Sequence, residues 1–251
     1  MAGTPSLALV LDGLSTAGLD TGCRHGVPWY VAQLGSHLVA ALAAGERPLA
    51  DGLADALENA RRLHPECDLK NPGTPSATVA ILRERSGCVD HLVLSDSPVV
   101  LENADGITVL TDLRVDQVCQ DLRAETEQLP TGTPEHRASV ARLVAAQREI
   151  RNTPEGCWVA AAAPDAASHA LTGTVAAADV RSAAVMSDGA SRLVTDYQMA
   201  TWEAVFSRLR ESGPAGLIHT VREVEATDPH GLRWPRYKAG DDAAVACCSF
   251  A

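Results

Sequence analysis

The stretch ATVAILRERSGCVDHLVLSDSPVVLENADGITVL, residues 77–110, decides the fold of this chain. It contains four short apolar runs that are rich in β-branched residues: Ala77–Leu82, Val89–Leu94, Val99–Leu101 and Ile107–Leu110. Short segments of Gly, Ser, Asp, Asn and Pro separate the runs, which predicts antiparallel strands joined by tight turns in a meander. A doubly wound parallel sheet would need a helix between successive strands, and these turns are too short to hold one.

Helical periodicity and further apolar runs lie on both sides of this meander. Apolar spacing predicts helices over residues 28–44, 49–63, 135–150, 198–211 and 214–226. Further strands are expected over residues 7–11, 158–163, 182–187 and 243–250, with none before residue 7, and polar loops over 13–27 and 125–137. No linker or solenoid repeat divides the sequence. We therefore expect one domain, residues 1–251, of the α+β class: an antiparallel β-sandwich flanked by helix pairs in four layers, α-β-β-α.

Composition and charge limit the partners. Apolar residues make up 46% of the chain, enough for a sizeable core, but no segment approaches the roughly 18 uninterrupted apolar residues of a membrane span. The N-terminus has no basic start or cleavage site of a secretory signal, so a cytoplasmic protein without a membrane partner is expected. The formal net charge of −11 disfavours a nucleic-acid partner, which needs a basic face.

The seven cysteines are odd in number and scattered along the chain. None forms a C-x-x-C pair, so the sequence indicates neither a zinc knuckle nor a disulfide framework. We expect reduced and mostly buried thiols.

Four aspartates stand at the ends of expected strands: Asp12, Asp96, Asp188 and Asp241. A carboxylate at the end of a buried strand is costly unless a positive group meets it. If the four ends converge, they form a set of oxygen ligands that suits Mg²⁺ or Mn²⁺ better than Zn²⁺. In the competing interpretation each aspartate only caps backbone N–H groups of its own turn. Asp242, next to Asp241, is expected to be either an acid that contacts the metal ligands without binding the metal or a turn acid.

Taken in chain order, these segments resemble motifs of the metal-dependent Ser/Thr protein phosphatases of type 2C, the PPM family. The matching segments are Leu9–Gly13, Pro72–Val79, Ser95–Ser97, Met186–Gly189 and Asp241-Asp242. The segment Thr21–Gly26, Thr-Gly-Cys-Arg-His-Gly, is similar to one found in a bacterial subgroup of that family. The resemblance extends from Leu7 to the C-terminus.

The resemblance implies a binuclear metal site and a function. Asp12 would bridge two Mn²⁺ or Mg²⁺ ions, Gly13 would lend its backbone carbonyl, and Asp188 and Asp241 would complete the site. Asp96 would hold a third, weaker ion. A water between the two ions would attack a phosphorylated protein substrate at phosphoserine or phosphothreonine, or a small phosphoester.

Further site residues follow from chemistry. With Asp12, His25 is the second candidate catalytic residue, because an imidazole in the loop after the metal strand can protonate a leaving alkoxide; a purely structural loop histidine is the alternative. Arg24 or Arg192 is the candidate substrate-binding residue, because a guanidinium fits phosphate oxygens.

Two departures from the family pattern open an alternative function. The eleven residues before Asp12 contain no Arg, Glu or Asp, so the family's usual N-terminal strand with its arginine and acid is lacking. Leu14-Ser15 stands where the family has His-Gly. A catalytically weak pseudophosphatase that acts as a binding or regulatory module is therefore the second hypothesis.

Other phosphatase chemistries fit the sequence less well. No cysteine is followed six positions later by arginine, which excludes a C-x₅-R thiolate nucleophile. No nucleotide-binding glycine motif occurs. An aspartyl-phosphate enzyme of the haloacid dehalogenase type remains as a third hypothesis, although it would have an Asp-x-Asp motif and alternating strands and helices.

Overall fold

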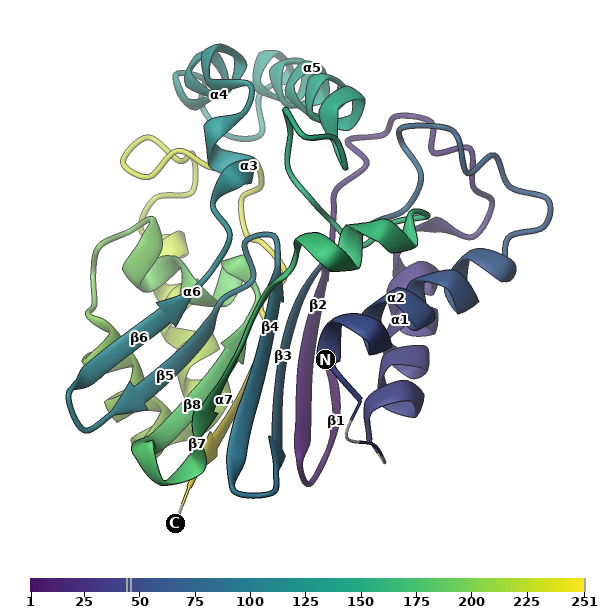
Figure 1. Cartoon of the computed structure of the whole chain (residues 1–251). Coiled ribbons are helices and arrows are strands. Elements are labelled where there is room, and N and C mark those ends of the chain that lie inside the picture. The colour runs from purple at the N-terminus through teal and green to yellow at the C-terminus, as the bar shows by residue number, and fades with distance from the viewer. Residues whose placement is uncertain (44, 46, 251) are drawn as a thin grey trace.

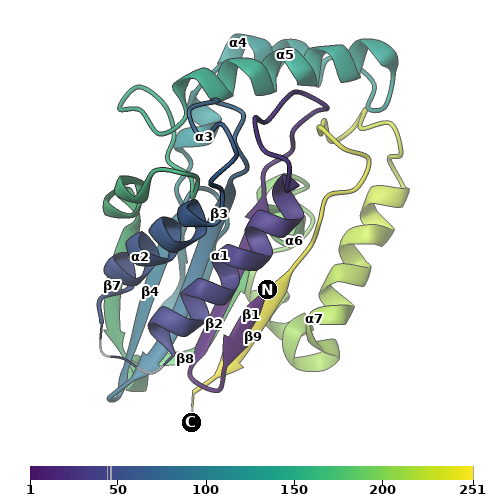
Figure 2. The same ribbon diagram turned by 90° about the vertical axis from the view of Figure 1, so that its right-hand side faces the viewer.

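The computed structural model describes residues 1–43, 45 and 47–250. Two antiparallel sheets stack on each other, and helices cover both outer faces (Figures 1 and 2). The first sheet has the order β1-β2-β3-β4-β7, formed by Ala2–Thr4, Leu7–Gly13, Ala77–Arg85, Cys88–Leu94 and Leu171–Ala176. The second has the order β6-β5-β8-β9, formed by Gly106–Leu110, Val99–Asn103, Val180–Met186 and Val245–Ser249. The α+β sandwich with helices outside is therefore confirmed.

The four strands of residues 77–110 are confirmed, but their continuous meander is wrong. β3 pairs with β4, and β5 pairs with β6, while β4 and β5 belong to different sheets. The chain crosses between the sheets at Ser95–Pro98, where Ser95 has a φ of +73°. The crossing places Asp96 between the two sheets' ends, at one rim of the sandwich.

One pair of helices covers the outer face of each sheet, and a third group of helices lies beyond the strand ends. α1 (Gly26–Leu42) and α2 (Leu49–Arg62) cover the first sheet; α6 (Asp188–Thr195) and α7 (Trp202–Ala226) cover the second. The third group is α3 (Arg114–Gln117), α4 (Gln120–Glu127) and α5 (Pro134–Ile150), above the strand ends in Figure 1. Two short 3₁₀ helices, η1 (Pro164–His169) and η2 (Ala177–Asp179), flank β7. No helix in the described part of the chain is long and apolar enough to cross a membrane.

Several element boundaries differ from those expected. The helices predicted over 28–44, 49–63 and 135–150 are α1, α2 and α5, and residue 44 lies outside the described residues. The two helices expected over 198–226 are one element, α7, broken at Gly213 (φ +68°). The strand expected over 158–163 is wrong, since only Ala160 bridges to Ala77. β1, β7, α3, α4 and α6 were not expected, and α4 and α5 occupy part of the loop predicted at 125–137.

Three apolar layers hold the sandwich together. Leu9 and Leu11 of β2 pack against α1 and α2, whereas Val10 faces the second sheet. In the second sheet, Val100 packs toward α6 and α7, while Val99 joins the layer between the sheets. Strands buried on both faces need apolar residues at successive positions, which explains why their sequences are continuous apolar runs instead of alternating patterns. The rigid layers in turn fix where the strand ends lie.

Candidate metal and substrate site

The ends of strands from both sheets meet at one cavity. Asp12 is next to last in β2, Asp188 begins α6 directly after β8, and Asp241 precedes β9. β2 packs against β8 and β9, so the three carboxylates converge from distant parts of the sequence. Together with Asp96 and Gly13 they line a cavity of about 610 Å³. All five residues expected to bind metal therefore surround the same space.

A glycine allows two of these carboxylates to approach. A Cβ at Gly189 would lie 2.3 Å from the carbonyl oxygen of Asp242, so no side chain fits there without a shift of the backbone. The same carbonyl accepts a hydrogen bond from Ser187 Oγ at 3.1 Å. These contacts join the segment that carries Asp188 to the segment that carries Asp241.

The crowding of carboxylates changes their protonation. Burial, followed by the hydrogen bond and charge of Asp188 and the charge of Asp241, raises the pKa of Asp12 to about 9. Burial and the charge of Asp188 raise the pKa of Asp96 to about 7. Like charges in a desolvated space favour the neutral acid, unless a cation neutralises them. An all-oxygen, electron-rich set of this kind fits hard divalent cations such as Mg²⁺ or Mn²⁺.

Two basic side chains share the cavity with these acids. Arg192 Nη2 lies 2.8 Å from Asp241 and 3.3 Å from Asp188, and Lys238 Nζ lies 2.5 Å from Asp241. Burial by itself raises the pKa of Asp241, but the hydrogen bond from Lys238 and the charge of Arg192 outweigh it and hold that pKa below its ordinary value. Burial by itself lowers the pKa of Arg192, whereas Asp188, Asp241 and Asp196 raise it above the ordinary value.

Arg192 also has a buried donor without a partner in the described part of the chain. Its Nη1 is buried and has no hydrogen-bond partner among the residues that the structure describes. An unpaired buried guanidinium nitrogen costs free energy. Arg192 as a residue lines the cavity, and a guanidinium group suits an anion with several oxygens. The candidate substrate-binding role of Arg192 is thus consistent with its position.

Further residues of the cavity were not predicted from the sequence. Arg148 and Arg151, at the end of α5, line the cavity, as does Lys238. Arg151 donates to Ser76 Oγ at 2.6 Å, and burial with the charge of Arg148 lowers its pKa to about 10. α3, α5 and α7 add an apolar wall, with Val140, Val144, Leu113 and Trp202 among its members. No local motif marks these residues, because the fold brings them in from beyond the strand ends.

His25 and Arg24 lie elsewhere. Neither is among the described residues that line the acidic cavity. Arg24 forms an exposed ion pair with Glu66 at 2.5 Å. The His25 ring stacks on Trp29, with 4.1 Å between ring centroids, and its Nδ1 approaches the sulfurs of two cysteines. The structure therefore brings together the predicted metal residues and Arg192, and it separates His25 and Arg24 from them.

The expectation of mostly buried thiols is wrong. Cys157 is buried, Cys247 is exposed, and the remaining five cysteines are half-buried. All seven are free thiols.

Comparisons with known proteins agree with this architecture. A family model described as "Protein phosphatase 2C" matches residues 2–222. No curated protein matches the sequence. A PPM Ser-Thr phosphatase from Mycobacterium smegmatis, solved with cacodylate, is 18% identical with a TM-score of 0.53, covering 100% of this chain and 90% of that one. PppA, a key regulatory component of the T6SS in Pseudomonas aeruginosa, is 18% identical with a TM-score of 0.53; the match covers 98% of this chain and 86% of PppA.

Two further solved structures extend the likeness. A serine-threonine phosphatase 2C from Toxoplasma gondii is 13% identical with a TM-score of 0.52, covering 98% of this chain and 85% of that one. The catalytic domain of the serine/threonine protein phosphatase PstP, solved with two manganese ions, is 17% identical with a TM-score of 0.50. The match covers 98% of this chain and 88% of the PstP chain.

Two antiparallel sheets between helix layers, with acids gathered at the strand ends, define the class of PPM-type phosphatase folds. The chain belongs to the protein phosphatase 2C family. The haloacid dehalogenase hypothesis is wrong, because the strands pair antiparallel in two sheets and do not alternate with helices in one parallel sheet.

Proposed function

We propose that this chain is a metal-dependent phosphatase that hydrolyses phosphoserine or phosphothreonine in proteins, or a small phosphomonoester. The observation that carries the proposal is the convergence of Asp12, Asp188 and Asp241 on one cavity, with the pKa of Asp12 raised to about 9 by burial and neighbouring acids. Such a set of carboxylates is poorly stable without a cation and well suited to one.

Asp12, Asp188 and Asp241, with the backbone carbonyl of Gly13, would hold two Mn²⁺ or Mg²⁺ ions, and Asp96 a third, weaker one. The PstP structure with two manganese ions supports that number. When bound, the ions supply an activated nucleophile and neutralise charge on the phosphate.

The chain's own residues bind and orient the substrate. Arg192, which lines the cavity, would contact a phosphate oxygen through its guanidinium group, while its Nη2 stays on Asp241. The apolar wall around Val144 and Trp202 would exclude water and contact the organic part of the ester. Since His25 lies outside the cavity lining, we do not assign it the transfer of a proton to the leaving group.

A second candidate, a pseudophosphatase that binds a partner or a phosphorylated ligand, is favoured by two observations. Arg192 and Lys238 already pair with Asp188 and Asp241, so part of the negative charge is neutralised by the protein itself. Internal cations of this kind compete with metal ions for the same oxygens. β1 also contributes no acid, since Ala2–Thr4 is apolar or neutral.

One experiment separates the two candidates. Hydrolysis of p-nitrophenyl phosphate and of a phosphothreonine peptide is measured with and without Mn²⁺, for the wild type and the isosteric variant Asp12→Asn. Mn²⁺-dependent turnover that Asp12→Asn loses supports the enzyme. Mn²⁺ or phosphopeptide binding by calorimetry without turnover supports the pseudophosphatase. Equal turnover in both proteins refutes the proposed metal site.

A further inference from the structure

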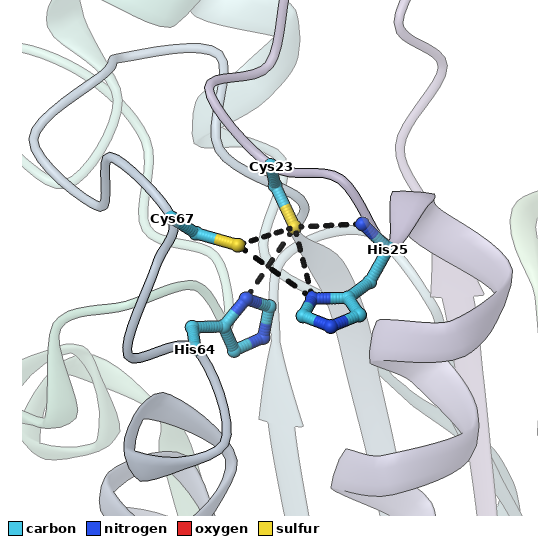
Figure 3. A group of neighbouring side chains, drawn as sticks. All are labelled: Cys23, His25, His64 and Cys67. Carbon is cyan, nitrogen blue, oxygen red and sulfur yellow. Dashed lines mark hydrogen bonds between the residues drawn. The ribbon is translucent and has the colours of Figure 1, made fainter.

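A second group of potential metal ligands lies outside the acidic cavity. Cys23, His25, His64 and Cys67, here called the Cys/His cluster, point their side chains toward one another (Figure 3). One ligand atom from each residue lies within 4.8 Å of all the others. Cys23 and His25 precede α1 in the chain, and His64 and Cys67 follow α2.

Four of the six distances between ligand atoms in the Cys/His cluster match the edges of a tetrahedron around a metal ion. Cys23 Sγ lies 3.7 Å from Cys67 Sγ, 3.4 Å from His64 Nδ1 and 3.7 Å from His25 Nδ1. Cys67 Sγ lies 3.6 Å from His25 Nδ1. With Zn–S near 2.3 Å and Zn–N near 2.05 Å, a regular tetrahedron has S···S edges of about 3.8 Å and S···N edges of about 3.6 Å. These four edges agree with the ideal values within about 0.2 Å. The other two, from His64 to Cys67 and from His64 to His25, lie within 4.8 Å.

Neither a disulfide nor hydrogen bonding alone accounts for the Cys/His cluster. A disulfide between Cys23 and Cys67 needs sulfurs about 2.05 Å apart, and both cysteines are free thiols in this structure. Thiol–imidazole hydrogen bonds explain single contacts, but they do not require four ligand atoms to face one common point. Cys₂His₂ is a standard ligand set for structural zinc.

We propose that Cys23, His25, His64 and Cys67 bind one structural Zn²⁺ ion. Two thiolates and two imidazoles are softer ligands than carboxylates and select Zn²⁺ over Mg²⁺ or Mn²⁺. Four protein ligands complete a tetrahedron and leave no open position for a substrate, so the site is structural and not catalytic.

The surroundings of the Cys/His cluster orient its ligands. Trp29 stacks on the ring of His25. It also lies edge-on to His64, with 4.8 Å between the Trp29 and His64 ring centroids. His64 is only 4% exposed. The backbone N–H of His25 donates to Cys23 Sγ at 3.4 Å. Packing and hydrogen bonds that fix ring and sulfur positions before the ion arrives increase affinity.

The position of the cluster indicates what the ion does. The ligands come from both ends of the α1–α2 hairpin, so one ion closes this hairpin. The two ligand-bearing loops also bond to each other, since Asp68 N donates to the Gly22 carbonyl at 2.9 Å and Asn71 Nδ2 donates to Asp20 at 2.9 Å. The first loop follows Asp12, and the second leads to β3. Zinc would therefore brace the loops on one side of the acidic cavity.

The test is metal analysis of the full-length protein, which does not depend on phosphatase activity. We expect about one zinc per chain by inductively coupled plasma mass spectrometry in the wild type. Cys67→Ser is expected to bind zinc at least about tenfold more weakly. The control Cys88→Ser, at a half-buried cysteine outside the cluster, is expected to keep its zinc. Asp12→Asn is also expected to keep it, which separates this inference from the proposed function.

A second readout covers the case in which Cys67→Ser fails to fold. Reduced, metal-free wild type is titrated with Co²⁺, and tetrahedral thiolate coordination is expected to produce a sulfur-to-cobalt charge-transfer band that Zn²⁺ removes. Zinc is also expected to protect Cys23 and Cys67, but not Cys247, from alkylation. A wild type that neither contains zinc nor takes up Co²⁺ or Zn²⁺ after reduction overturns the proposal, as does a metal-free Cys23–Cys67 disulfide in the protein as purified.

Discussion

Replacement of Gly189 by alanine tests whether the acidic cavity depends on close approach of two loops. The added Cβ would lie 2.3 Å from the Asp242 carbonyl oxygen and 3.2 Å from Cβ of Asp241. Ordinary contacts begin near 3.4 Å, so the loop before β9 has to move by about 1 Å. The obstacle is backbone, which cannot rotate away as the end of a flexible side chain can.

Two consequences follow from a shift of this size. Overpacking typically costs about 1–3 kcal/mol of the free energy of unfolding, and each kcal/mol lowers the Tm of a chain this long by about 2–4 °C. A misplacement of about 1 Å between catalytic groups reduces turnover on the order of 100-fold. Because the movement separates Asp241 from Asp188, Mn²⁺ affinity is expected to fall as well.

Mn²⁺ binding by calorimetry, Tm by differential scanning calorimetry and turnover of p-nitrophenyl phosphate are measured for Gly189→Ala and for the control Gly240→Ala. In the control the atoms nearest to the new Cβ are at the ends of the flexible Arg222 and Glu225 side chains, at 3.3 Å. It is expected to change stability by less than about 0.5 kcal/mol. Wild-type Mn²⁺ affinity and Tm in Gly189→Ala would refute the claim that this contact holds the site together.

Three further outcomes are expected. In the folded protein the pKa of Asp12 is raised to about 9. The folded metal-free protein therefore retains a proton on Asp12 that the unfolded chain loses above about pH 4. Because of this difference, the free energy of unfolding should fall by up to about 1.4 kcal/mol per pH unit between about pH 5 and 9. Urea titrations show no such fall if the acids are not crowded, and saturating Mn²⁺ should remove it. Asp90 lies 2.8 Å from the Arg83 side chain, which is 3% exposed. Asp90→Ala leaves this buried guanidinium without its charge partner and should lower the free energy of unfolding by about 3–5 kcal/mol in the same urea titrations. A loss under about 1 kcal/mol contradicts this. Arg192→Met should raise KM for p-nitrophenyl phosphate about tenfold, whereas Arg24→Met should leave KM unchanged, and equal effects would contradict the assignment of the phosphate contact.

Secondary structure is predicted best from the sequence where a local pattern of residues is compatible with a single type of element. The continuous apolar runs of β2, β4 and β8 are strands because both of their faces are covered, and the acids that stand at or follow their ends converge as expected. β7 was missed because it is a sheet edge with mostly exposed side chains and no apolar pattern. The apolar run at 158–163 misled in the opposite direction: Trp158 stacks on His169, and the segment packs against the core without pairing as a strand.

The Cys/His cluster could not be predicted from the sequence, for a different reason. Its ligands stand as Cys-x-His and His-x-x-Cys at opposite ends of a helical hairpin, so no window of the sequence contains both pairs. A search for C-x-x-C spacing does not find such a cluster, because the packing of α1 against α2 sets the distance between the two pairs. The cavity arginines of α5 were missed for the same reason, since a helix beyond the strand ends supplies them.

Two sites of different softness in one chain lead to a last prediction. Zn²⁺ binds most nitrogen, oxygen or sulfur ligand sets more tightly than Mn²⁺, so the carboxylate site cannot exclude zinc by affinity alone. The Cys/His cluster gains more from zinc because thiolates are soft ligands, and it should fill first as Zn²⁺ is added. In protein that has first been freed of zinc, we expect the first equivalent of Zn²⁺ to raise the Tm without affecting Mn²⁺-dependent turnover, and further equivalents to inhibit turnover by displacing Mn²⁺ from Asp12, Asp188 and Asp241. Inhibition by the first equivalent, with no change in Tm, would mean that zinc prefers the carboxylates and that the two sites are not separated by ligand chemistry.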